Sequence, residues 1–132
     1  MYKLFTAGII SLFLAHSAGA QSAVFDGERL ISMCQQEACV RGVKATVGQV
    51  LLERLLPGDF NSQLGIIAGL LFAATDGAEE PLLGQLAAGL RALAQYSTDP
   101  AQQASFIQVA GEIVSGSASL FDLDAPFAVS PS

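Results

Sequence analysis

Histidine, tryptophan and basic side chains are scarce in this sequence. Its 132 residues include one histidine, no tryptophan, two cysteines, and six Lys plus Arg against twelve Asp plus Glu, for a net charge of -6. Charged residues make up 14% of the chain, against roughly 25% in an ordinary soluble domain. The acidic balance argues against a nucleic-acid partner, because binding to phosphates needs clustered Lys and Arg. The length fits one small domain.

The first twenty residues predict a secretory signal peptide. Lys3 supplies the positive start, residues 4–15 are almost unbroken apolar sequence, and small residues at Ala18 and Ala20 predict cleavage before Gln21. A retained membrane anchor is the alternative, but a dozen apolar residues fall short of the ~20 that a spanning helix needs. We therefore expect a periplasmic or secreted protein with no stable membrane span after cleavage.

Cleavage would remove the only histidine, His16. Residues 21–132 would keep five basic side chains against twelve acidic ones, a net charge of -7. A chain without histidine cannot use a histidine general base, a Ser–His or Cys–His dyad, or histidine-ligated zinc or haem. The composition therefore favours a protein that is not an enzyme.

The two cysteines, Cys34 and Cys39, predict a disulfide, since exported proteins meet oxidising conditions. Residues five apart in a continuous helix lie too far apart for this bond, so it requires a helix break near Gln36. Unpaired or intermolecular thiols and a redox-active pair are the alternatives. Four intervening residues, including Glu37, do not match the usual redox spacing.

Apolar residues recur at helical spacing from Glu28 onward. The pattern predicts an all-α fold, a compact bundle of about four main helices over residues 40–55, 60–74, 82–95 and 100–115, with a short leading helix before them. Asp59 or Asn61 can cap the second of these, and Asp99 and Gln102 have capping-box spacing at the start of the last. The predicted organisation is a signal peptide over 1–20, a helical domain over 21–116, and a Ser/Ala/Pro-rich tail over 117–132.

Residues 64–74 contain no charged side chain and read as the central helix of the bundle. Gly65 and Gly69 lie four residues apart, a spacing that lets another helix approach closely. The tail carries Phe121 and Phe127, aromatic residues that usually pack against or bind something. These four residues form the candidate interaction surface. The alternative is that small residues simply allow tight packing inside the monomer.

No motif for catalysis, for a cofactor or for a metal ion emerges from the sequence. Lys44 is the only base for a Ser–Lys dyad, and it falls on a polar helix face. Asp122 and Asp124 are too few for calcium, and adjacent Glu79 and Glu80 read as charge at a helix start.

Three functions remain open. The leading one is an exported, non-catalytic helical protein that acts by protein–protein interaction or self-association. The second is a periplasmic carrier of a lipid or another apolar small molecule. The third is a carboxylate-dependent envelope hydrolase, for which the sequence shows no acid–base pair. If the tail takes part in association, deletion of residues 120–132 is expected to weaken it.

Overall fold

The computed structural model describes residues 22–116, and this part of the chain is all-helical without strands. Its helices are α2 (Gly27–Gln35), α3 (Cys39–Leu51), α4 (Pro57–Ala73), α5 (Leu82–Ala94) and α6 (Pro100–Ser115). The predicted all-α bundle with a short leading helix is therefore confirmed. The predicted signal peptide and tail lie outside the described residues.

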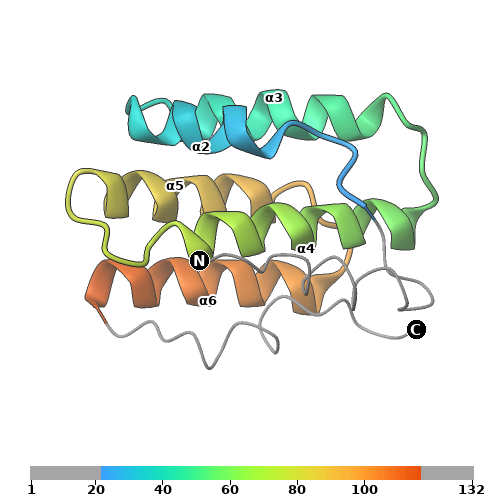
Figure 1. Ribbon diagram of the computed structural model, residues 1–132. Helices are drawn as coiled ribbons and strands as arrows, with labels where there is room; N and C mark the ends of the chain where they lie inside the picture. The colour runs from blue at the N-terminus through green and yellow to red at the C-terminus, as the bar shows by residue number, and fades with distance from the viewer. Residues whose placement is uncertain (1–21, 117–132) are drawn as a thin grey trace, which may run out of the picture.

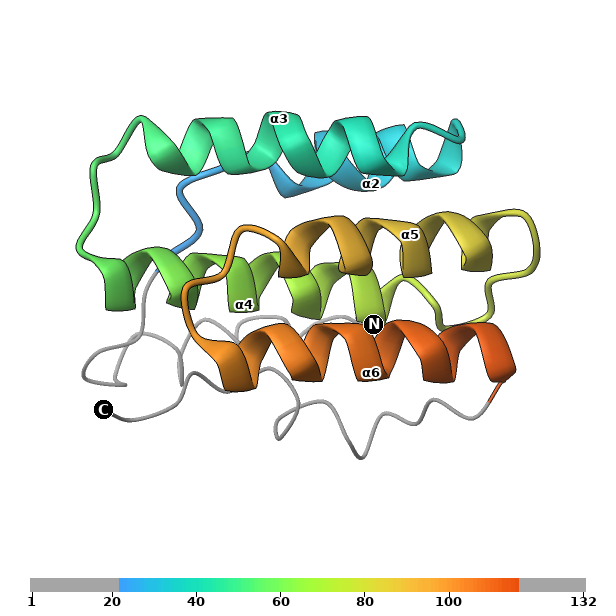
Figure 2. The same cartoon turned by 180° about the vertical axis from the view of Figure 1, so that it is seen from behind.

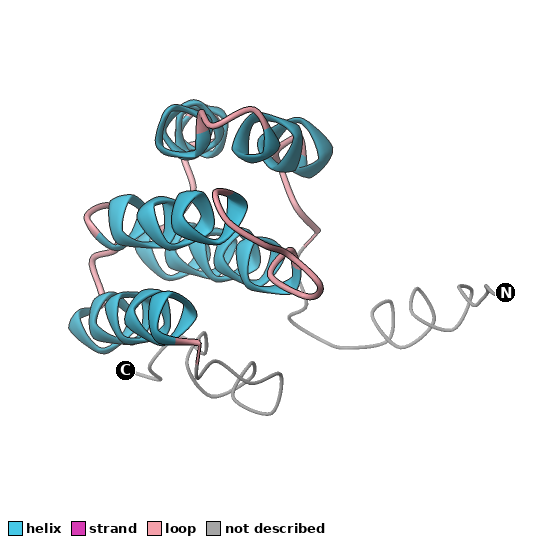
Figure 3. Cartoon of the chain, turned by 90° about the vertical axis from the view of Figure 1, so that its left-hand side faces the viewer, coloured by secondary structure: helices cyan, strands magenta, loops and turns pink. Residues whose placement is uncertain are grey.

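The helices stack in layers, with α2 and α3 on one side, α4 and α5 in the middle and α6 on the other side (Figures 1 and 3). Figure 2 shows α5 from behind, lying between α3 and α6. The α5 helix packs against α2, α3, α4 and α6, whereas α4 and α6 make little contact with each other. The helix predicted over residues 64–74 as central thus lies in the middle layer, which it shares with α5, and α5 is the helix that contacts all the others described.

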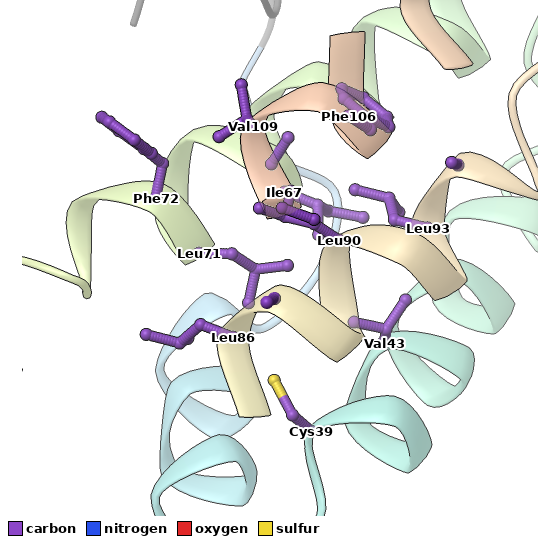
Figure 4. Close-up of a cluster of buried hydrophobic side chains, with 14 of the residues drawn as sticks. Cys39, Val43, Ile67, Leu71, Phe72, Leu86, Leu90, Leu93, Phe106 and Val109 are labelled. Carbon is purple, nitrogen blue, oxygen red and sulfur yellow. The ribbon is translucent and has the colours of Figure 1, made fainter. Parts of the chain in front are cut away.

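One apolar core joins all five described helices, and Figure 4 labels the side chains that α3, α4, α5 and α6 contribute to it. Leu90 on α5 and Phe106 on α6 are fully buried in it. The other large buried side chains are Leu30, Val43, Val47, Leu64, Ile67, Leu71, Leu86 and Leu93. Val40, Ile107 and Val114 fit the helical spacing of the apolar residues, but they are about half exposed at 49%, 53% and 56%.

The helical conformation is interrupted between α2 and α3, at the place where the disulfide requires it. Cys34 and Cys39 are bonded, with their Cα atoms 3.8 Å apart. The α2 helix ends at Gln35, and Glu37 adopts a left-handed backbone with φ 59°. Both sulfur-bearing residues are buried, at 1% and 0% exposure. The predicted pairing and helix break are confirmed, and the burial favours a structural bond over a redox-active one.

The α3 helix ends earlier than the sequence predicted. It stops at Leu51 rather than near residue 55, and Arg54 lies in the left-handed region with φ 53°. Proline usually stops a helix, and here Pro57 instead starts α4, where its fixed φ and missing N–H suit the first turn. Leu52 is left 79% exposed in the connection.

The α5–α6 connection is held by buried amide groups. Asp99 caps α6 as predicted, accepting hydrogen bonds from the N–H groups of Ala101 (2.9 Å) and Gln102 (3.4 Å). Gln102 does not complete the predicted capping box, because the Asp99 N–H donates to Ser97 Oγ instead. Gln102 is fully buried, donates to the Asn61 carbonyl of α4 at 2.9 Å, and accepts from Ser97 Oγ at 2.6 Å. Asn61 is therefore a buried link to this turn and not a helix cap.

The segment ahead of α2 is held along its backbone. Gln63 of α4 is 1% exposed; its amide donates to the Ser22 carbonyl at 2.9 Å and accepts from the Val24 N–H at 3.0 Å. Gln49 of α3 accepts from the Asp26 N–H at 3.0 Å. Two side-chain amides thus fix the entry to the bundle. Each described helix also falls short of the length or hydropathy needed to cross a bilayer.

Candidate interaction surfaces

The glycines of the bundle fall into two groups according to the space around them. A Cβ on Gly89 of α5 would lie 2.9 Å from Cys39 Sγ, and one on Gly42 of α3 would lie 3.1 Å from Met33 Cβ. These glycines let helices approach closely inside the core. Tight packing within the monomer, one of the two interpretations of the small residues, therefore accounts for this group.

Gly69 belongs to the second group. A Cβ built on Gly69 would meet no atom within 4 Å, and the same holds for Gly48 on α3 and Gly111 on α6. Helix interiors disfavour glycine by roughly 1 kcal/mol relative to alanine. Packing inside the described part of the monomer does not explain why Gly69 is a glycine.

Gly65 and Gly69 lie on one side of α4, which we call the α4 outer face. It comprises Ser62, Gly65, Ile66, Gly69, Leu70 and Ala73, spaced so that all project from the same side of the helix. All six are partly or fully exposed, whereas Leu64, Ile67 and Leu71 on the opposite side are buried. The only charged residue in α4 is Asp59, in its first turn. This face is thus uncharged, small-residue rich and open to solvent.

A shallow groove borders the α4 outer face. It lies between α2 and α4 and has a volume of about 490 Å³. Ile31 and Leu70 supply its apolar side chains, and Glu28, Ser32 and Gln35 supply polar ones. The fit at its floor is close, since a Cβ on Gly27 would come within 2.8 Å of Leu70 Cδ1. Leu70 belongs to both the groove and the outer face, so the two surfaces adjoin at this side chain.

A second groove runs between α5 and α6 on a different part of the bundle. Its volume is about 510 Å³, and it is lined by Arg91, Ala94 and Gln95 of α5 with Gln103 and Ile107 of α6. Arg91 is exposed and brings a guanidinium to an otherwise uncharged lining.

The predicted site residues therefore have different outcomes. The structure brings Gly65 and Gly69 together on a partly exposed face and pairs Cys34 with Cys39. Phe121 and Phe127 lie outside the described residues. Among residues 22–116, no group of three or more His, Cys, Asp or Glu side chains could hold a metal ion.

The α5–α6 groove and the buried glutamines were missed by sequence reasoning. Apolar side chains of α6 point to two sides of the helix, and helical spacing alone does not say which side meets the core. Gln63 and Gln102 carry no sequence signal of burial, because glutamine is mostly an exposed residue. The one available clue was Arg91, the only basic residue after Arg54.

Comparisons with protein-family models, with curated proteins and with solved structures each found no match. Function must therefore be inferred from these surfaces themselves, since a helical bundle hosts many unrelated functions.

Proposed function

We propose that this chain is an exported, non-catalytic protein that acts by self-association or by binding another protein through the α4 outer face. The observation that carries the proposal is Gly69, a helix-interior glycine on a partly exposed apolar face with room for a side chain. A close-packed neighbouring helix would give a reason for glycine there. The absence of charge from this face also favours a partner surface that excludes water.

Self-association is the first form of this proposal to test. A two-fold contact uses the same patch on both copies, so an uncharged face can meet itself without like-charge repulsion. On the α4 outer face, Ile66 and Leu70 offer side chains that could pack beside the glycines of a second copy.

Replacing Gly69 by leucine is expected to weaken self-association by about five- to a hundredfold, because overpacking a close contact costs roughly 1–3 kcal/mol. Gly48→Leu is the matched control, since Gly48 is also an exposed helix-interior glycine with no atom within 4 Å of its Cβ position. Both substitutions improve helix propensity, so both chains should fold. Sedimentation equilibrium over a range of protein concentrations measures the dissociation constants.

Equal dissociation constants for the two variants would contradict this role for the α4 outer face. If the wild-type chain sediments as a monomer at every concentration, self-association is wrong. Binding of another protein is then tested by affinity capture from the native envelope. The proposal requires that Gly48→Leu retains a partner protein that Gly69→Leu loses.

Export is the second element of the proposed function. The buried Gln63 amide donates a hydrogen bond to the Ser22 carbonyl, so the chain is attached to the bundle from the second residue after Ala20. Cleavage there would leave only Gln21 ahead of this attachment. The buried disulfide is also compatible with an oxidising compartment.

Processing gives a direct test of export. When the full sequence is expressed in an exporting bacterial host, intact mass is expected to show a chain starting at Gln21 in the periplasmic or extracellular fraction. Ala20→Phe, which places a large side chain at the cleavage position, is expected to retain residues 1–20. A wild-type chain that keeps residues 1–20 would refute the signal peptide.

A carrier of an apolar small molecule is the second candidate function. The two grooves, at about 490 and 510 Å³, fall within the range of small-molecule sites, roughly 300–1,000 Å³. Native mass spectrometry of protein purified from its own envelope distinguishes the two functions. A bound small molecule would favour the carrier, and a ligand-free mass would count against it.

A further inference from the structure

The α6 helix carries apolar residues on two sides. Phe106, Ala110 and Ile113 are buried, whereas Ile107 and Val114 are more than half exposed. Between the two exposed side chains lies Gly111, which is also exposed and has no atom within 4 Å of its Cβ position. Ile107, Gly111 and Val114 are spaced by four and three residues, so they form one exposed strip along α6, called here the α6 strip.

The α6 strip leads from the end of the helix to the α5–α6 groove. At one end, Gly116 closes α6 in the left-handed conformation with φ 81°, which turns the chain away from the helix axis. At the other end, Ile107 is part of the groove lining. The nine residue-to-residue steps from Ile107 to Gly116 rise about 14 Å in an α-helix. Four or five extended residues span the same distance.

The sequence after Gly116 matches this surface in chemistry. Counting four to five residues from Gly116 places Leu120 and Phe121 level with Ile107, and the groove extends one further helical turn to Gln103. Leu120 is followed by residues 121–124, which read Phe-Asp-Leu-Asp and alternate apolar and acidic side chains. In an extended chain, alternate side chains project to opposite sides. One side would then be apolar and the other acidic.

Charge favours the same placement. Arg91 is the only basic residue between Leu55 and Ser132, and it lines the α5–α6 groove. Asp122 and Asp124 would reach the level of this guanidinium while Phe121 and Leu123 cover apolar surface. The α4 outer face has no cation to offer them.

We propose that the segment 120–124 of this chain docks in its own α5–α6 groove, running back along the α6 strip. The occupant is the same copy, because a connection of three residues after Gly116 keeps the segment at high effective concentration near the groove. Phe121 and Leu123 would cover the exposed side chain of Ile107, and Asp122 or Asp124, on the other side of the extended segment, would pair with the exposed Arg91 side chain. This site is separate from the α4 outer face, so either can fail without the other.

Photo-cross-linking of the full mature chain tests the docking. With p-benzoylphenylalanine in place of Ile107, irradiation is expected to give adducts within the same chain at residues 120–124, located by peptide mass spectrometry. The matched control carries the same group in place of Val40, which is similarly exposed but lies on α3, in the outer layer opposite α6. Position 40 is expected to give no adduct at residues 120–124.

Charge exchange supplies the second arm. Arg91→Glu is expected to lower the adduct yield at position 107 by about two- to fivefold, as for an exposed ion pair. Adding Asp122→Arg and Asp124→Arg to that chain is expected to restore the yield, and circular dichroism checks that every variant is folded. Three results would each overturn the proposal. They are adducts between two copies of the chain, an adduct yield from position 107 equal to that from position 40, and a yield that stays the same after both charge changes.

Discussion

Replacing Gln102 by alanine is expected to lower the free energy of unfolding by about 3 kcal/mol, because buried polar groups lose their partners and a cavity forms. In the wild-type chain the Gln102 amide donates to the Asn61 carbonyl and accepts from the Ser97 hydroxyl. Both partners are themselves buried, at 5% and 4% exposure. Water cannot easily replace the lost amide at this position.

The effect should reach beyond α6, because Gln102 connects three elements. Asn61 also bonds the backbone N–H and side chain of Thr98 in the α5–α6 turn, at 3.1 and 2.8 Å. Loss of Gln102 therefore loosens the start of α4 from the turn that leads into α6. Hydrogen exchange at amides near Thr98 is expected to accelerate together with the global loss of stability.

Gln108→Ala is the matched control for this measurement. Gln108 lies on the same helix and is exposed, with one long hydrogen bond of 3.3 Å to Glu112. Its replacement is expected to change stability by less than about 0.5 kcal/mol. Urea unfolding followed by circular dichroism compares the chains, and equal midpoints for the two variants would contradict a structural role for the buried amide.

Removing the disulfide from the wild-type chain is expected to lower the free energy of unfolding by a second large amount, independent of the Gln102 effect. The bond closes a short loop, for which the chain-entropy model gives about 2 kcal/mol at room temperature. Both cysteines also belong to the buried core. Cys39 Sγ packs beside Gly89, and a Cβ built on Gly89 would lie only 2.9 Å from that sulfur. The double substitution Cys34→Ala with Cys39→Ala therefore loses the cross-link and core contacts together.

Reductant separates these two losses. Dithiothreitol is expected to lower the melting temperature of the wild-type chain and to leave that of the double alanine variant unchanged. The difference between the reduced wild-type chain and the variant then gives the packing contribution of the two sulfur atoms. A wild-type melting temperature that does not respond to complete reduction would contradict a stabilising bond.

Much of the architecture could be predicted from local chemistry. The Asp99 cap, the glycine at the end of α6 and the break at the disulfide each depend on neighbouring residues, so the sequence carries the signal. The end of α3 could not be placed in the same way. The apolar spacing continues through Leu55, but Arg54 turns left-handed and the helix stops at Leu51.

The packing partners of each helix were harder to predict. Residues 64–74 are apolar on every side, so periodicity does not indicate which side faces the core. In the structure one side of α4 packs inward and the other carries Gly65 and Gly69. Ile107 shows the same ambiguity on α6, because its spacing from Phe106 and Ala110 fits an inward-facing position although the side chain is 53% exposed.

The attachment of the entry segment also bears on how freely its sequence can vary. The bonds from Gln63 to the entry segment reach the main chain of Ser22 and Val24, and the side chains of Ser22 and Ala23 are exposed. Replacements of Ser22 or Ala23 that leave the carbonyl in place preserve these bonds, whereas Val24 also packs against the core. Substitutions beside the predicted processing site could therefore accumulate over evolution and change recognition by the export machinery. The hydrogen bonds between Gln63 and the entry segment would stay the same.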